Sequence, residues 1–186
     1  MHFRFSGLVL SKNDAQQICK LLQNLNPKPL GCGFTEIDLS CRINITSSRD
    51  SLNGYQKGKC FYCRKGIQIE KSSDGDIVDV DHFFPHTLLN ELPEVNINGV
   101  WNLVLACQEC NRGTGGKFER IPKIKFLERL HARNEYLINS HHPLRETIIN
   151  QTGKDTPYRV KFLQQMDQKA IDIIPTRWSP PEAHEG

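Results

Sequence analysis

Long apolar runs are absent from this 186-residue sequence, and no segment approaches the eighteen or more apolar residues that a membrane-spanning helix needs. The first ten residues lack the apolar centre and the cleavage site of a signal peptide. Internal repeats and low-complexity tracts are missing too, which argues against repeat and fibrous architectures. With 38% hydrophobic and 24% charged residues, we expect a folded cytoplasmic protein.

A strong excess of one charge is also lacking. The formal net charge is +3 and the sequence pI is about 8.5, values that permit nucleic-acid binding without requiring it. The distribution is more informative, because residues 111–145 hold eight Lys or Arg and only three acids. This basic stretch directly follows the second of two cysteine motifs.

Cysteine is present in an odd number, seven, which argues against a framework of disulfides. Four of the seven form two Cys-x-x-Cys pairs separated by 43 residues: Cys60, Cys63, Cys107 and Cys110. Four thiolates satisfy a tetrahedral zinc ion, and two intervening residues let one turn present both sulfurs. A redox role needs only one pair and usually a βαβ context, so we predict a closed, structural zinc site.

The three other cysteines show no paired spacing: Cys19, Cys32 and Cys41. Free cysteine generally behaves as a small buried hydrophobic residue. We therefore expect core or incidental positions for them.

Hydrophobic periodicity predicts helices over residues 13–25, 123–139 and 157–171. Pro143 can open a further short helix over 144–151, which Gly153 ends. Short β-prone runs predict a hairpin that pairs residues 67–70 with 77–80, a strand over 101–106, and a possible strand over 35–45. We expect the proline-rich end, residues 178–186, to fray.

These patterns predict an α+β fold in three segments. Residues 1–58 form a helix-containing segment of unknown role, residues 59–121 form the zinc-bound core, and residues 122–186 form a helical extension. The chain is too short for two full-sized domains.

Between the cysteine pairs lies the run Asp-Val-Asp-His-Phe-Phe-Pro-His over residues 79–86, and residues 101–112 surround the second pair. The order Cys-x-x-Cys, Asp-His-x-x-Pro, Asn-Leu-x-x-x-Cys-x-x-Cys-Asn, then lysine, resembles the HNH endonucleases. The resemblance covers residues 60–117, about a third of the chain, and its elements are specific only in combination. It implies a small ββα-metal nuclease core that hydrolyses DNA phosphodiester bonds.

The same resemblance implies roles for four residues. It makes Asp81 and Asn111 ligands of a catalytic metal ion, His82 the general base, and Asn102 a brace for the loop that carries the base. Chemistry agrees, because a neutral imidazole can deprotonate water and oxygen ligands suit Mg²⁺ or Mn²⁺. We expect Zn²⁺ as structural and Mg²⁺ or Mn²⁺ as catalytic cofactor.

Each of these residues also has an ordinary interpretation. His82 can be a half-buried strand histidine, Asp81 a turn acid, Asn102 a hydrogen-bonding residue at a strand edge, and Asn111 a helix cap. Neighbours on a regular strand also face opposite ways, so Asp81 and His82 share a phosphate only if the chain bends or a metal bridges them.

The remaining candidates concern partners. Arg112, Lys117 and His86 are candidate contacts to DNA, most simply a duplex, although a solvated surface is the alternative. The adjacent His141 and His142 have no further ligand at metal spacing, which favours a structural role. Two alternative functions stay open: a non-catalytic zinc-dependent module that binds nucleic acid, and helices after residue 122 that dock onto another protein.

Overall fold

The computed structural model divides into two compact units, Met1–Asn44 and Ile45–Gly186. The structure describes residues 3–5, 8–10, 48–69 and 78–180. In the first unit, strand β1 (Phe3–Phe5) pairs antiparallel with β2 (Leu8–Leu10). The predicted helix over 13–25 and the possible strand over 35–45 lie outside the described residues.

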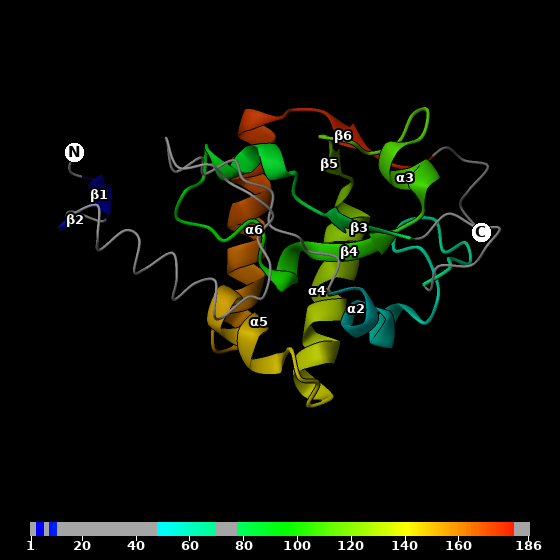
Figure 1. Cartoon of the computed structure of the whole chain (residues 1–186), viewed down its shortest axis with the longest axis horizontal. Helices are drawn as coiled ribbons and strands as arrows, with labels where there is room; N and C mark the ends of the chain where they lie inside the picture. Colours follow the sequence, from blue (N-terminus) through cyan, green and yellow to red (C-terminus); the bar gives the residue numbers. More distant parts are fainter. Residues whose placement is uncertain (1–2, 6–7, 11–47, 70–77, 181–186) are drawn as a thin grey trace. The chain divides into compact units, whose positions relative to one another are not determined.

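The second unit is built around an antiparallel pair of strands, β3 (Asp79–His82) and β4 (Leu103–Ala106). Asp79 lies opposite Ala106, and His82 lies opposite Leu103. Every residue of β4 is buried, which fits its uninterrupted apolar sequence. Three of the four residues of β3 are polar, and only one residue of that strand is buried. Helix α3 (Gln108–Arg112) follows β4 directly. The order of the three elements is therefore ββα (Figure 1).

The outer edge of β4 is covered by side chains instead of a third strand. Helix α2 (Arg49–Gln56) places the Gln56 amide against Leu105, where it accepts from the backbone N–H and donates to the carbonyl, both at 2.8 Å. The backbone N–H of Phe61 donates to the same carbonyl. Because an open edge invites pairing with another chain, these bonds protect the strand.

The three C-terminal helices agree with the periodicity of the sequence. They are α4 (Ile124–Asn139), α5 (Arg145–Thr152) and α6 (Thr156–Ile173), each within two residues of its predicted bounds. Asp155 caps α6 by accepting from the backbone N–H of Tyr158 at 2.8 Å. None of the helices among the described residues combines the length and the apolarity needed to cross a membrane.

Helix α4 is joined to the ββα elements by two arginines, so it is part of their support. The guanidinium of Arg133 is almost fully buried and donates to the carbonyls of Val100, Trp101 and Leu103. One turn earlier, Arg129 donates to the carbonyls of Phe61 and Tyr62, within the first cysteine pair. The helix therefore holds both strand β4 and the cysteine turn (Figure 1).

Large apolar side chains fill the space between these elements. The largest that are fully buried include Phe61, Phe83, Phe84, Trp101, Phe126, Leu103 and Leu105. Several of the rings pack edge to face, such as Phe61 on Phe83 at 6.1 Å between centroids. The core thus surrounds the segment that carries the motif.

Two strand predictions need correction. Residues 67–69 form no strand, and β3 pairs with β4, although one hydrogen bond still joins the backbone N–H of Val78 to the carbonyl of Gln68. The run over 101–106 begins in a 3₁₀ turn, η3 (Val100–Asn102), before β4. Pairing of distant strands depends on tertiary packing, which a local pattern does not contain.

The described residues after α6 include a strand that the composition of this segment does not indicate. β5 (Ile121–Pro122) pairs in parallel with β6 (Arg177–Trp178). Trp178 is buried, so the prediction of fraying is wrong for this residue, while residues 181–186 lie outside the described range. Its indole N–H donates to the carbonyl of Gly115 at 2.7 Å, in the loop after α3.

Candidate functional site

The four cysteines of the two pairs come together at one end of the β3–β4 pair. Cys60 and Cys63 belong to a tight turn closed by a bridge between Lys59 and Gly66. Cys107 is the N-cap residue of α3, and Cys110 lies within that helix. All four sulfurs lie within 4.8 Å of one another. This confirms the predicted cluster.

The spacing of the sulfurs suits a tetrahedral ion. Four Zn–S bonds of about 2.3 Å place neighbouring sulfurs about 3.8 Å apart, and the Cys63 and Cys107 sulfurs are 3.7 Å apart. The backbone N–H of Cys107 also points at the Cys60 sulfur, 3.4 Å away. Thiol hydrogen bonds from Cys107 and Cys110 lower the pKa of Cys60, while the contact with Cys60 and burial help to raise the pKa values of Cys107 and Cys110. Thiolate is the form that binds metal. The cluster can therefore hold one structural metal ion such as zinc.

Asp81 lies in the interior beside this cluster, with its side chain 8% exposed. Its carboxylate accepts from the Tyr62 hydroxyl at 2.7 Å and lies 3.4 Å from the Lys117 ammonium. Burial raises the pKa of Asp81, and the charge of Lys117 and the hydrogen bond from Tyr62 oppose that rise. The side chain that the resemblance makes a metal ligand is thus held by two protein groups.

Lys117 is fully buried. Its ammonium donates to the carbonyl of His82 at 2.9 Å and to that of Phe118 at 3.1 Å, in addition to its ion pair with Asp81. Burial lowers the pKa of Lys117, and the Asp81 carboxylate opposes this change. The predicted contact of Lys117 with a DNA backbone does not fit this position. Lys117 instead joins the loop after α3 to the end of β3.

Asn111 approaches a different carboxylate of the same strand. Its amide nitrogen donates to Asp79 at 3.0 Å, and the Nε of Arg112 donates to the same oxygen at 3.0 Å. Asp79 is partly exposed, with 21% of its side chain accessible, and it lies two residues before Asp81 on the same face of β3. Strand alternation was the signal that would have added Asp79 to the predicted site.

His82 is the last residue of β3, and its side-chain partner differs from those of Asp81. Its Nε2 is 2.8 Å from the side-chain oxygen of Asn98, and its ring lies 5.4 Å from that of His86, at the start of η2 (His86–Leu89). Asn98 was not predicted, because it comes from a loop sixteen residues away with no motif of its own. The Asp81 and His82 side chains thus have separate partners in the structure.

Asn102 is fully buried and braces the segment after His82. Its side chain accepts from the backbone N–H of Phe84 at 2.8 Å and donates to the carbonyls of Phe84 and Ile97 at 3.0 and 2.9 Å. Its own carbonyl accepts from the backbone N–H of Phe83 at 2.7 Å. This is the bracing role that the resemblance implies.

Comparisons with protein families, curated proteins and solved structures give no match for this chain. The likeness to HNH nucleases therefore depends on the motif residues themselves. Among the described residues, the four cysteines are the only set of three or more Cys, His, Asp or Glu side chains grouped closely enough to hold one ion.

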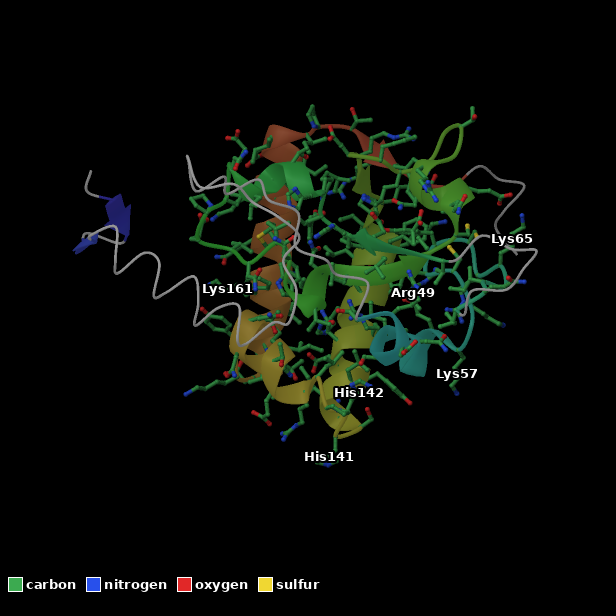
Figure 2. The ribbon with its side chains drawn as sticks, viewed as in Figure 1. Arg49, Lys57, Lys65, His141, His142 and Lys161 are labelled. Atoms are coloured by element: carbon green, nitrogen blue, oxygen red, sulfur yellow. The ribbon has the colours of Figure 1, made fainter. Side chains whose placement is uncertain are left out.

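The adjacent histidines lie apart from these groups, at the turn between α4 and α5 (Figure 2). His141 adopts a positive φ of 54°, and the His142 Nδ1 accepts from the backbone N–H of Leu144 at 3.2 Å. These positions agree with the structural role predicted for the pair.

Proposed function

We propose that this chain is a metal-dependent endonuclease of the HNH type that hydrolyses phosphodiester bonds in DNA. The observation that carries the proposal is the link between Asn111 on α3 and Asp79 on β3, at 3.0 Å. It brings an amide and a carboxylate together on the strand that also carries His82. The four-cysteine cluster fixes α3 beside that strand.

The divalent cation is held in this proposal by Asn111 and a carboxylate of β3. The resemblance assigns Asp81, but the geometry favours Asp79, because Asn111 already contacts it while Tyr62 and Lys117 hold Asp81. An amide oxygen and a carboxylate are suitable donors for Mg²⁺ or Mn²⁺. When bound, such an ion neutralises charge on the phosphorane and on the leaving oxygen.

His82 is the general base of the proposed reaction. With the Asn98 oxygen as acceptor, the proton of the neutral ring resides on Nε2, so Nδ1 carries the lone pair that takes a proton from water. Asn102 positions the ring indirectly by fixing the backbone of Phe84. The closed cysteine site offers no open coordination position and takes no part in the chemistry.

Nicking of supercoiled plasmid by the full chain tests the activity. We expect cutting with Mg²⁺ or Mn²⁺ and none without a divalent cation, with a loss of at least about a hundredfold in His82→Ala. The matched control is His142→Ala, whose ring lies at the α4–α5 turn and should leave the rate unchanged. If well-folded protein cuts neither duplex nor single-stranded DNA, the alternative of a zinc-dependent binding module replaces this proposal.

A second pair of variants distinguishes the roles of the two acids of β3. Asp79→Asn is expected to abolish metal-dependent cutting with little change in melting temperature, since Asp79 is partly exposed. Asp81→Asn leaves the buried Lys117 without its carboxylate and should lower the melting temperature. Full activity of Asp79→Asn would return the ligand role to Asp81.

A further inference from the structure

Phe118 combines two unusual properties directly beside the proposed site. Its side chain is 54% exposed, and its backbone adopts a left-handed φ of 47°. A single exposed apolar residue is ordinary, and so is a left-handed glycine. A bulky aromatic residue in that conformation is an outlier, and such strain often accompanies a binding role.

The strained backbone is held by hydrogen bonds from the groups of the site. The N–H of Phe118 donates to the carbonyl of Asn111 at 2.9 Å, and its carbonyl accepts from the Lys117 ammonium. The same ammonium donates to the carbonyl of His82. Phe118 is therefore bonded directly to the proposed ligand Asn111. Its neighbour Lys117 is bonded to His82, the proposed base.

The rest of this loop is equally constrained. The Arg120 guanidinium donates to the carbonyls of Gly115, Gly116 and Lys117, and the Trp178 indole donates to that of Gly115. A loop held at this many points fixes the backbone that carries the aromatic ring. Little backbone freedom is then lost when a partner packs on the ring.

The charges near Phe118 in the sequence indicate the chemistry of that partner. Within residues 112–125, Arg112, Lys123 and Lys125 are exposed against one exposed acid, Glu119, and the exposed acids Glu109 and Glu128 lie just outside this range. Cations that meet phosphates, with an aromatic ring that meets a base, are the usual means of binding single-stranded nucleic acid. Core packing does not explain a ring that is more than half accessible.

We propose that Phe118 stacks on an unpaired base of the substrate strand next to the phosphate at the proposed site. This inference rests on the proposed function and refines its substrate. In a regular duplex both faces of a base are stacked, so the ring reaches a base face only where a step is opened. The chain should therefore prefer single-stranded, bulged or frayed DNA to perfect duplex.

Binding of an oligonucleotide that carries 2-aminopurine tests the stacking without any cleavage. The full zinc-loaded chain is titrated, with no added Mg²⁺ or Mn²⁺, into single-stranded, single-base-bulged and fully paired DNA. We expect quenching of the single-stranded and bulged probes, and a loss of about tenfold in affinity for them in Phe118→Ala. Phe118→Trp should retain both signals.

Two controls separate stacking from folding. Phe118→Gly removes the ring and relieves the left-handed strain, so we expect a higher melting temperature together with weaker binding. Tyr158→Ala removes another exposed ring, 61% accessible on α6, and should leave binding unchanged. Equal affinity and equal quenching in wild type and Phe118→Ala would overturn the proposal, as would tighter binding to perfect duplex.

The outcome stays distinct from that of the nuclease proposal. Phe118-dependent quenching without metal-dependent cutting would keep the stacking site and remove the enzyme. Cutting that is indifferent to Phe118 on all three DNA forms would keep the enzyme and remove the stacking site. Quenching confined to RNA versions of the probes would overturn DNA as the substrate in both the nuclease and the stacking proposals.

Discussion

The four-cysteine cluster and the polar groups of β3 share the same strands and helix, yet the sequence determines them to different degrees. Each cysteine pair is local, since one tight turn places both sulfurs and only thiolates suit a closed site of this kind. The polar groups of β3 depend on which face each side chain takes and which partner is buried beside it. Spacing alone therefore predicts the first region well and the second only in outline.

The two regions also differ in which groups compensate their buried negative charges. At the cysteines, a metal ion can neutralise the thiolates. Around Asp81, the protein supplies a buried ammonium and a hydroxyl, from Lys117 and Tyr62. If this contrast is correct, metal removal and removal of Lys117 should weaken the protein in distinguishable ways.

The largest effect is expected from Cys107→Ser. It removes one of four ligands, and structural zinc sites of this type contribute on the order of 10 kcal/mol to folding. We expect zinc content to fall from about one per chain and the cooperative melting transition to disappear. Cys32→Ser is the control, because Cys32 has no partner at ligand spacing. Retained zinc with intact melting in Cys107→Ser would exclude four-cysteine ligation.

Next in size is Lys117→Met, which leaves the Asp81 carboxylate buried without its cation. Breaking one partner of a buried pair costs about 3 to 5 kcal/mol, measured here by urea unfolding. Lys65→Met is the control, since its pair with Glu109 is exposed and should contribute little to stability. Equal losses in the two variants would contradict the buried position of Lys117.

The pH dependence of Lys117→Met follows from the same pair. Burial already raises the pKa of Asp81, and loss of the Lys117 charge should raise it further. An acid whose pKa is higher in the folded than in the unfolded protein binds its proton more tightly in the folded state. Its contribution to folding stability is fully present below the unfolded pKa of about 3.9 and is lost as pH rises through the folded pKa. The deficit of the variant should therefore grow between mildly acidic and neutral pH, and adding Asp81→Asn should remove that growth.

These buried charges show where sequence-based inference stops. Lysine is rarely buried, so Lys117 was assigned to the surface next to a nucleic acid. The helices α4 and α6 were predicted from their apolar periodicity and α5 from the proline and glycine that flank it, and all of these signals are local. Helix α2 was missed because Gly54 weakens its propensity and Gln56 contacts β4, 49 residues away in sequence. Asp79 was missed because the motif draws attention to Asp81.

A smaller loss is expected from Asn102→Ala, which leaves three buried backbone groups of Phe84 and Ile97 without their partner. We expect about 2 to 4 kcal/mol less stability by urea unfolding, with faster amide hydrogen exchange at Phe84. The zinc content should stay at about one per chain. The control is Asn150→Ala, at an exposed position of α5. Unchanged exchange at Phe84 would mean that the brace is not needed.

The smallest change, Tyr62→Phe, tests whether the two regions are separate at all. Tyr62 lies between Cys60 and Cys63, and its hydroxyl donates to Asp81 at 2.7 Å. Removing this hydroxyl should cost about 1 kcal/mol, while the ring keeps its packing on Phe126 and Trp178. The pKa of Asp81 should rise, because the hydrogen bond from Tyr62 lowers it.

Competition with a chelator then decides between two descriptions of the molecule. If zinc affinity in Tyr62→Phe equals that of Tyr136→Phe, an exposed control on α4, the cysteine cluster forms independently of the buried acid. If zinc affinity falls along with stability, the hydroxyl transmits the state of Asp81 to the metal site. The cluster and the strand would then form one cooperative unit, because a turn that has lost its bond to Asp81 no longer presents Cys60 and Cys63 in the geometry that zinc requires.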